Sequence, residues 1–132
     1  MKKAIEKQVG GIHYKHMFYQ PVELFARTQC TAFQANIWKY ISRYEFKDGR
    51  QDLEKCIHYA NLAIELECEK ELSASEMEEV HIFCSANSSL SVSQKYVITL
   101  AALNRYDELI EICEGIMSNE YPDEPDRLRS VK

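Results

Sequence analysis

Cationic and aromatic side chains recur at helical spacing between residues 36 and 59. The first group is Asn36, Lys39, Tyr40, Arg43 and Lys47, and the second group, after an Asp-Gly turn, is Asp52, Lys55 and Tyr59. Steps of three and four residues place side chains over one another on a helix, so each group shares one flank. Lysine and arginine bind phosphate through charge-assisted hydrogen bonds. Because tyrosine faces can also stack on a base, the pattern is typical of a nucleotide site.

Two helices joined by a short turn are expected to position these groups. Thr31 predicts the N-cap of a helix that runs to about Phe46. Its apolar stripe is Phe33, Ile37, Ile41 and Tyr44. Residues 47–49 break this helix, because Gly49 can take the left-handed conformation that closes a helix end. The next helix is predicted to run from about residue 51 to residue 70.

A connection this short makes the two helices antiparallel neighbours. We therefore expect Tyr59 to approach the level of Tyr40 or Asn36, with a groove between the helices. The cations that would hold phosphate are Lys39, Arg43 and Lys55. Asp52 would orient Arg43 or accept a ribose hydroxyl. In such a solvated groove, the Arg43 guanidinium is expected to contribute little to packing.

The same residues have a plainer interpretation as a solvated helix face. Mixed charges at helical spacing commonly form only weak pairs, each contributing a few tenths of a kcal/mol. Trp38 is likewise more often a packing residue, and together with Phe33 it is a candidate for an oligomer interface. Both interpretations stay open at the level of the sequence.

The rest of the chain predicts further helices and no sheet. The expected helices cover 21–29, 73–86, 91–103 and 107–117, with a capping box at Ser73 and Glu76 and with Asp107 capping the last. The expected inward positions are Leu53, Cys56, Ile57, Ala60, Ile64 and Leu66, then Val92, Tyr96, Val97, Leu100 and Ala101. The fold class is therefore all-α, a small bundle of five to six helices with a central antiparallel helical hairpin.

The domain organisation follows from these elements. Residues 1–118 are expected to form one helical domain, with a core over 12–70 and additional helices over 73–118. Residues 1–12 suggest a loose arm, and residues 119–132 have too little apolar surface to fold. Truncation after Met117 should therefore leave the melting temperature unchanged.

Composition excludes several classes of function. A net charge of −5 over 132 residues argues against general nucleic-acid binding, which needs a dense basic face. The five cysteines are widely spaced without a C-x-x-C pair, so they are predicted to be buried reduced thiols. The four histidines form no metal motif, and no metal site is predicted. Without a signal-like or membrane-spanning apolar run, we expect a cytoplasmic protein with no membrane partner.

Standard catalytic motifs are absent from the sequence. There is no G-x-x-x-x-G-K-[ST] phosphate loop, and the serines include no G-x-S-x-G nucleophile elbow. An enzyme built on this chain would therefore have to use another arrangement, and whether it is an enzyme stays open.

Five blocks in order carry a family resemblance. They are His13-Tyr14, Gln20-Pro21-Val22-Glu23, Asn36-x-x-Lys39-Tyr40-x-x-Arg43, Lys47-x-Gly49-x-x-Asp52-Leu53-x-Lys55, and Tyr59. Together, over about residues 12–66, they resemble a family of short phage-encoded proteins of unknown function. One member of that family is described as a nucleotide kinase that acts on deoxynucleoside monophosphates without a P-loop. Two positions depart from the family: Ala35 stands where glycine is frequent, and Cys56 where alanine is usual.

The resemblance implies a phage or prophage nucleotide-binding protein, with nucleoside monophosphate kinase activity as its catalytic form. ATP would be the phosphate donor of such a kinase, with Mg²⁺ as a metal that it could require. The alternative is a non-catalytic helical oligomer that sequesters a nucleotide or docks on a host protein. That alternative accounts better for the missing catalytic base.

Large aromatic residues also predict self-association. The residues concerned are Phe18, Tyr19, Phe25, Phe33 and Trp38. They offer more apolar surface than one short helical hairpin can cover, and exposed patches of that size usually mark an interface. We therefore expect a homo-oligomer, most simply a two-fold dimer.

Overall fold

Six α-helices account for most of the computed structural model, which describes residues 17–122. They are α1 (Pro21–Arg27), α2 (Ala32–Arg43), α3 (Arg50–Glu65), α4 (Ala74–Ala86), α5 (Val92–Ala102) and α6 (Tyr106–Glu120), with a 3₁₀ turn η2 (Tyr44–Phe46) after α2. No strand occurs in the described part of the chain, which confirms the all-α prediction. The arm expected over residues 1–12 lies outside the described residues.

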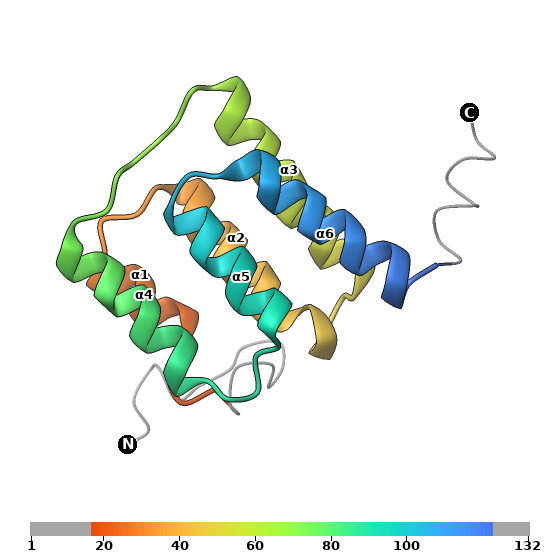
Figure 1. Ribbon diagram of the computed structural model, residues 1–132, viewed down its shortest axis with the longest axis horizontal. Helices are drawn as coiled ribbons and strands as arrows, with labels where there is room; N and C mark the ends of the chain where they lie inside the picture. Colours follow the sequence, from red (N-terminus) through yellow and green to blue (C-terminus); the bar gives the residue numbers. More distant parts are fainter. Residues whose placement is uncertain (1–16, 123–132) are drawn as a thin grey trace, which may run out of the picture.

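The helices form two layers of three. Helices α1, α2 and α3 make one layer, and α4, α5 and α6 lie in front of them in the view of Figure 1. Each helix of the first layer packs on its counterpart in the second: α1 on α4, α2 on α5 and α3 on α6. The predicted antiparallel hairpin is α2 with α3, and these two helices share the most extensive contact in the bundle. None of the helices within 17–122 is long and apolar enough to cross a membrane.

Side-chain caps fix the starts of three helices. Thr31 and Ser73 accept hydrogen bonds from the backbone N–H groups of Gln34 and Glu76, at 3.0 and 3.2 Å, as the sequence predicts. Ser91 caps α5 in the same way, at 3.1 Å from the Gln94 nitrogen. The expectation for the last helix is wrong, because α6 begins at Tyr106 after Arg105 and has no side-chain cap. Asp107 lies instead in the first turn of α6, where a negative charge complements the helix dipole.

Helices α2 and α5 are joined by a matched pair of glutamines. The amide nitrogen of Gln34, near the start of α2, donates to the Ala101 carbonyl in the last turn of α5 at 3.1 Å. In the opposite direction, Gln94 near the start of α5 donates to the Ile41 carbonyl in the last turn of α2 at 2.8 Å. Last-turn carbonyls lack partners within their own helix, so the Gln94 bond satisfies a group that burial would otherwise penalise. The Ala101 carbonyl also accepts from the Asn104 N–H at 3.1 Å. The pair holds the two central helices antiparallel.

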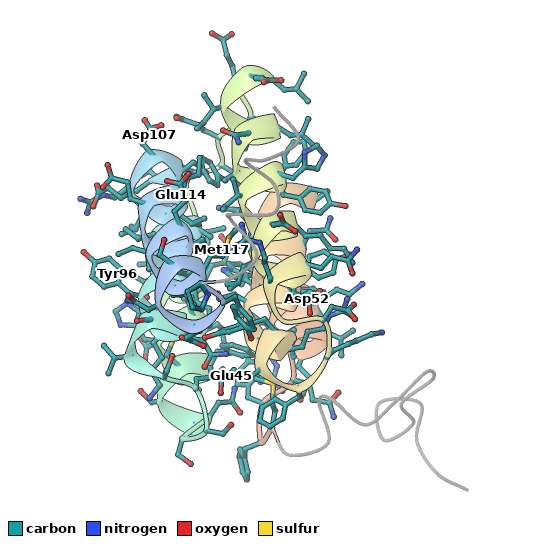
Figure 2. The ribbon with its side chains drawn as sticks, turned by 90° about the vertical axis from the view of Figure 1, so that its right-hand side faces the viewer. Glu45, Asp52, Tyr96, Asp107, Glu114 and Met117 are labelled. Carbon is teal, nitrogen blue, oxygen red and sulfur yellow. The ribbon has the colours of Figure 1, made fainter. Side chains whose placement is uncertain are left out.

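The core lies between the two layers, and it corrects several predicted inward positions. On α3, Leu53, Cys56 and Ala60 are buried as expected. Ala63 completes this face, whereas the predicted Ile64 and Leu66 are exposed. On α5, Val97, Leu100 and Ala101 are buried as expected. Val92 and Tyr96 are exposed instead, and Figure 2 shows Tyr96 on the outer face of the second layer.

The aromatic residues that predicted an interface are mostly covered within one chain. Trp38 is fully buried, and its indole N–H donates to the Ile98 carbonyl of α5 at 3.1 Å. Tyr19 is buried against Phe83, and Phe25 stacks on Trp38 with 6.3 Å between ring centroids. Assigning Trp38 to an oligomer interface is therefore wrong. The second layer supplies the cover that the hairpin alone lacks.

All five cysteines are free thiols. Cys56 on α3 and Cys113 on α6 are buried, and the other three are partly buried. Burial, with a contribution from the neighbouring Cys113 thiol, raises the pKa of Cys56 well above its ordinary value. Cys56 is therefore a neutral packing group, as the sequence predicts.

The C-terminal end of α6 packs against the α2–α3 turn. The helix continues to Glu120, beyond the predicted end at Met117. The Tyr44 hydroxyl lies 3.3 Å from both carboxylate oxygens of Glu120. Gly49 has a φ of +49°, and a Cβ atom there would lie only 3.1 Å from the Tyr121 ring. The part of the predicted tail that covers residues 123–132 lies outside the described residues.

Truncation after Met117 is now expected to lower the melting temperature by a few degrees. The shorter chain loses the Tyr44–Glu120 hydrogen bond and the packing of Tyr121 on the turn, at a cost of about 1–2 kcal/mol. The matched control is a chain that ends at Pro122, which keeps both contacts. Calorimetric melting of the two truncated chains measures the difference. Equal melting temperatures would show that these contacts add no stability.

Candidate functional site

Three cations surround the ring of Tyr40. The Arg43 guanidinium carbon lies 4.7 Å from the ring centroid, and the Lys55 and Lys39 ammonium nitrogens lie 4.8 and 5.0 Å from it. A cation within about 6 Å of a ring is attracted to its face. Tyr40 therefore collects side chains from both α2 and α3 into one positively charged cluster. We call Lys39, Tyr40, Arg43 and Lys55 the Tyr40 cluster.

The turn between the helices sets the positions of these side chains. The Gly49 N–H donates to the Tyr44 carbonyl at 2.9 Å, and its positive φ reverses the chain within a few residues. Helix α3 then begins at Arg50, which puts Asp52 in its first turn. A carboxylate in the first turn is stabilised by the helix dipole, and Asp52 also accepts from the Asp48 N–H at 3.3 Å. These contacts fix the position of the Asp52 carboxylate next to the cluster.

A buried ion pair anchors the cluster. The Arg43 Nε and Nη2 donate to the two oxygens of Asp52, each at 3.2 Å. The Arg43 side chain is 8% exposed and the Asp52 side chain 0% exposed. The expected role of Asp52 in orienting Arg43 is confirmed by this two-point contact. The expectation that Arg43 contributes little to packing is wrong, because α3 closes over its guanidinium.

Ion pairs crowd the cations of the cluster together. The Lys55 ammonium lies 3.9 Å from Asp52, and Arg43 also lies 3.7 Å from Asp48. Arg43 and Lys55 thus share the Asp52 carboxylate, which brings two cations close together on a partly buried surface. Like charges at these distances repel one another, and the repulsion is stronger away from bulk water. An added anion would relieve it.

A second tyrosine extends the cluster across the hairpin. Tyr59 of α3 stacks beside Tyr40 with a centroid distance of 6.0 Å and an interplanar angle of 7°. The predicted approach of these two rings is thereby confirmed. On its other side, Tyr59 lies 6.5 Å from the ring of Phe33 on α2. Phe33, Tyr59 and Tyr40 therefore form one row of partly buried rings, which we call the ring row.

Two of the predicted site residues do not join the cluster. The Asn36 amide nitrogen donates to the carbonyl of Ala32 one turn earlier on α2 at 2.9 Å, so this group serves its own helix. Lys47 is exposed in the turn after η2, and no ion pair or ring contact links it to another described residue. Helical spacing suggested both, but η2 ends the α-helical geometry before Lys47.

Two further residues belong to the site although the sequence assigned them elsewhere. Asp48, which was placed in the turn, pairs with Arg43. Phe33, which was placed in the apolar stripe and at a candidate oligomer interface, contacts Tyr59. The position of Phe33 could have been found from spacing, since it precedes Tyr40 by seven residues, or about two helical turns. The position of Asp48 depends on the shape of the turn, which no spacing rule gives.

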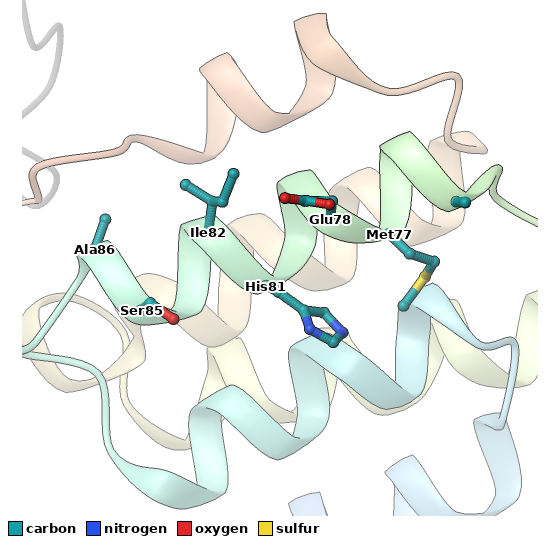
Figure 3. A pocket seen from close by; sticks show the side chains of 7 residues that line it. Met77, Glu78, His81, Ile82, Ser85 and Ala86 are labelled. Atoms are coloured by element: carbon teal, nitrogen blue, oxygen red, sulfur yellow. The ribbon is translucent and has the colours of Figure 1, made fainter.

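The site is a cluster at the surface, and a cavity along α4 lies apart from it. A cavity of about 720 Å³ runs along α4, where it is lined by residues such as Met77, His81 and Ile82. Figure 3 shows His81 and Met77 pointing towards α5 and Ile82 towards the opposite side. Within residues 17–122, no three His, Cys, Asp or Glu side chains come together as metal ligands. In the side view of Figure 2, Asp52 lies in the first layer, far from Tyr96 on the second.

The Tyr40 cluster lies in the part of the chain that matches a protein-family model. Residues 10–61 match the model of a protein family of unknown function (DUF3310). This range covers less than half of the chain, and it contains α1, α2 and most of α3 with all eight predicted site residues. The match agrees with the resemblance to a family of unknown function, and it assigns no activity. The chain matches no curated protein and no solved structure.

Proposed function

We propose that this protein binds a nucleotide on the outer surface of the α2–α3 hairpin, with a phosphate group at the Tyr40 cluster. The observation that carries the proposal is the gathering of three cations within 5.0 Å of one tyrosine ring. Isolated surface charges would separate to reduce their repulsion, whereas Asp52 holds Arg43 and Lys55 together beside the Tyr40 ring. Such a preset group of donors favours an anion because little is lost in ordering it.

The roles within the site follow from geometry. Lys55 and Lys39 carry flexible ammonium groups that can meet a phosphate above the ring of Tyr40. The ion pair of Arg43 and Asp52 forms the fixed part of the site, and Asp52 also orients Lys55. A base attached to that phosphate would lie over Tyr59, the ring next to Tyr40. The resemblance to a phage-encoded family of unknown function, one member of which is described as a nucleotide kinase, supports the same class of ligand.

Binding is the function that this geometry supports best. Phosphoryl transfer would need mainly positioning and charge neutralisation, and the cluster offers both. The carboxylate nearest the cluster is Asp52, which already accepts from Arg43 and is fully buried, so it is badly placed to act as a base. A protein that holds a nucleotide without turning it over is therefore the simpler form of the proposal.

Thermal shift and calorimetric titration with the four deoxynucleoside monophosphates test the proposal. A ligand at 100 times its dissociation constant should stabilise the fold by about 2.7 kcal/mol. Lys39→Gln and Lys55→Gln should each weaken binding about tenfold or more, because each removes a charge-assisted donor. The matched control is Lys95→Gln on α5 in the other layer, which should bind as the unmodified protein does.

The outcomes are distinct. If no nucleotide binds, or if the Lys95 variant loses as much affinity as the other two, the site is misplaced. Transfer of labelled phosphate from ATP to a bound monophosphate would show the catalytic form. Binding with the ligand recovered unchanged would show the sequestering form.

A further inference from the structure

The ring row contains more aromatic rings than the base of a single nucleotide can stack on. The cations gather only at its Tyr40 end, while Tyr59 and Phe33 extend it by 6.0 and then 6.5 Å. Phe33 and Tyr40 are seven residues apart on α2, which is about 10 Å along the helix axis. A nucleotide with its phosphate at Tyr40 has one base to place, and Tyr59 is the neighbouring ring. Phe33 is left as a third ring beyond it.

We infer that the site takes a dinucleotide or the end of a short single strand, with one phosphate at the Tyr40 cluster and two consecutive bases along Tyr59 and Phe33. This inference rests on the proposed function. Proteins that hold single strands stack successive bases on aromatic side chains next to a positively charged track. The ring row has that arrangement at the length of two bases.

The charge of the cluster fits the same class of ligand. The three cations lie together at one end of the ring row, where a single phosphodiester can meet them. No ring contact in the described structure places a cation over Tyr59 or Phe33, whereas three surround Tyr40. A long strand would need further cations along its backbone, and the net charge of −5 offers no such surface. The site is therefore suited to a short ligand.

Calorimetric titration of the full chain can separate one base from two. The probes are the four deoxynucleoside monophosphates and the corresponding 5′-phosphorylated homodinucleotides. The dinucleotide of at least one base should bind roughly tenfold or more tightly than its monophosphate, since each base stacked on a ring adds affinity. Phe33→Leu should reduce that advantage to less than twofold. Phe18→Leu, at an 86% exposed ring outside the row, is the matched control and should leave the advantage in place.

Each result decides between the two proposals. Equal affinities for every mononucleotide and its dinucleotide would overturn the two-base inference and leave nucleotide binding standing. No binding of any probe by the folded protein would overturn both. If Phe33→Leu keeps the dinucleotide advantage intact, or weakens both kinds of ligand equally, then Phe33 only packs on Tyr59 and the second base has no place there. The melting temperature of the Phe33 variant is measured alongside, so that lost affinity is compared only between folded proteins.

Discussion

Replacing Asp52 by alanine is expected to destabilise the protein by about 3–5 kcal/mol, because the buried Arg43 guanidinium loses its two-point carboxylate contact and keeps the longer one to Asp48, at 3.7 Å. The Arg43 side chain is 8% exposed and cannot turn into solvent without opening the contact between α2 and α3. Urea unfolding of the variant and the parent chain measures the difference. The matched control is Glu114→Ala on α6, which removes an exposed carboxylate and should change stability by less than about 0.5 kcal/mol.

A double variant separates the net contribution of the Arg43–Asp52 ion pair to stability from the cost of removing only one of its two charges. Exchanging both partners, Arg43→Met with Asp52→Leu, removes the two buried charges together and should recover much of the lost stability. A loss below about 1 kcal/mol for Asp52→Ala alone would mean that water reaches Arg43 and that the pair is a surface one. Arg43→Ala also removes the two-point donor of the buried Asp52 carboxylate, which keeps, among the described residues, only Lys55 at 3.9 Å and the Asp48 N–H at 3.3 Å. It would therefore weaken the fold together with any ligand site. Lys39 and Lys55 are therefore the better positions for testing binding.

Trp38→Ala is expected to cost a similar amount, about 3–5 kcal/mol, for a different reason. The indole is fully buried between the layers, where it stacks on Phe25 and donates to the Ile98 carbonyl. Alanine would leave a cavity there, and it would also leave that carbonyl without its partner. Trp38→Phe keeps most of the volume, so it should cost less and isolate the hydrogen bond and the remaining gap.

The control for Trp38 is an aromatic residue on the outer face. Tyr96→Ala, on the exposed side of α5, should change the free energy of unfolding by less than about 0.5 kcal/mol. If Trp38→Ala and Tyr96→Ala unfold at the same urea concentration, the two layers do not close over Trp38 as described.

The sequence predicted the local structure well because its signals are local. Thr31, Ser73 and Ser91 begin their helices with hydroxyl caps that need only the next three residues. Gly49 closes the hairpin because its positive φ suits a residue without a side chain. Once that turn is fixed, helical spacing brings Tyr59 beside Tyr40, so the meeting of these rings also followed from the sequence.

Burial was decided by the tertiary structure, because it depends on what covers a helix. Lys39 and Arg43 occupy the same flank of α2 in the sequence pattern, yet α3 buries Arg43 against Asp52 and leaves Lys39 at the surface. Trp38 could have served an interface, but α5 covers it within the same chain. Val92 and Tyr96 are as apolar as their neighbours and remain outside, since α5 has one neighbouring layer only. Periodicity predicts which residues share a face, and only the packing of the neighbouring helices decides which face is buried.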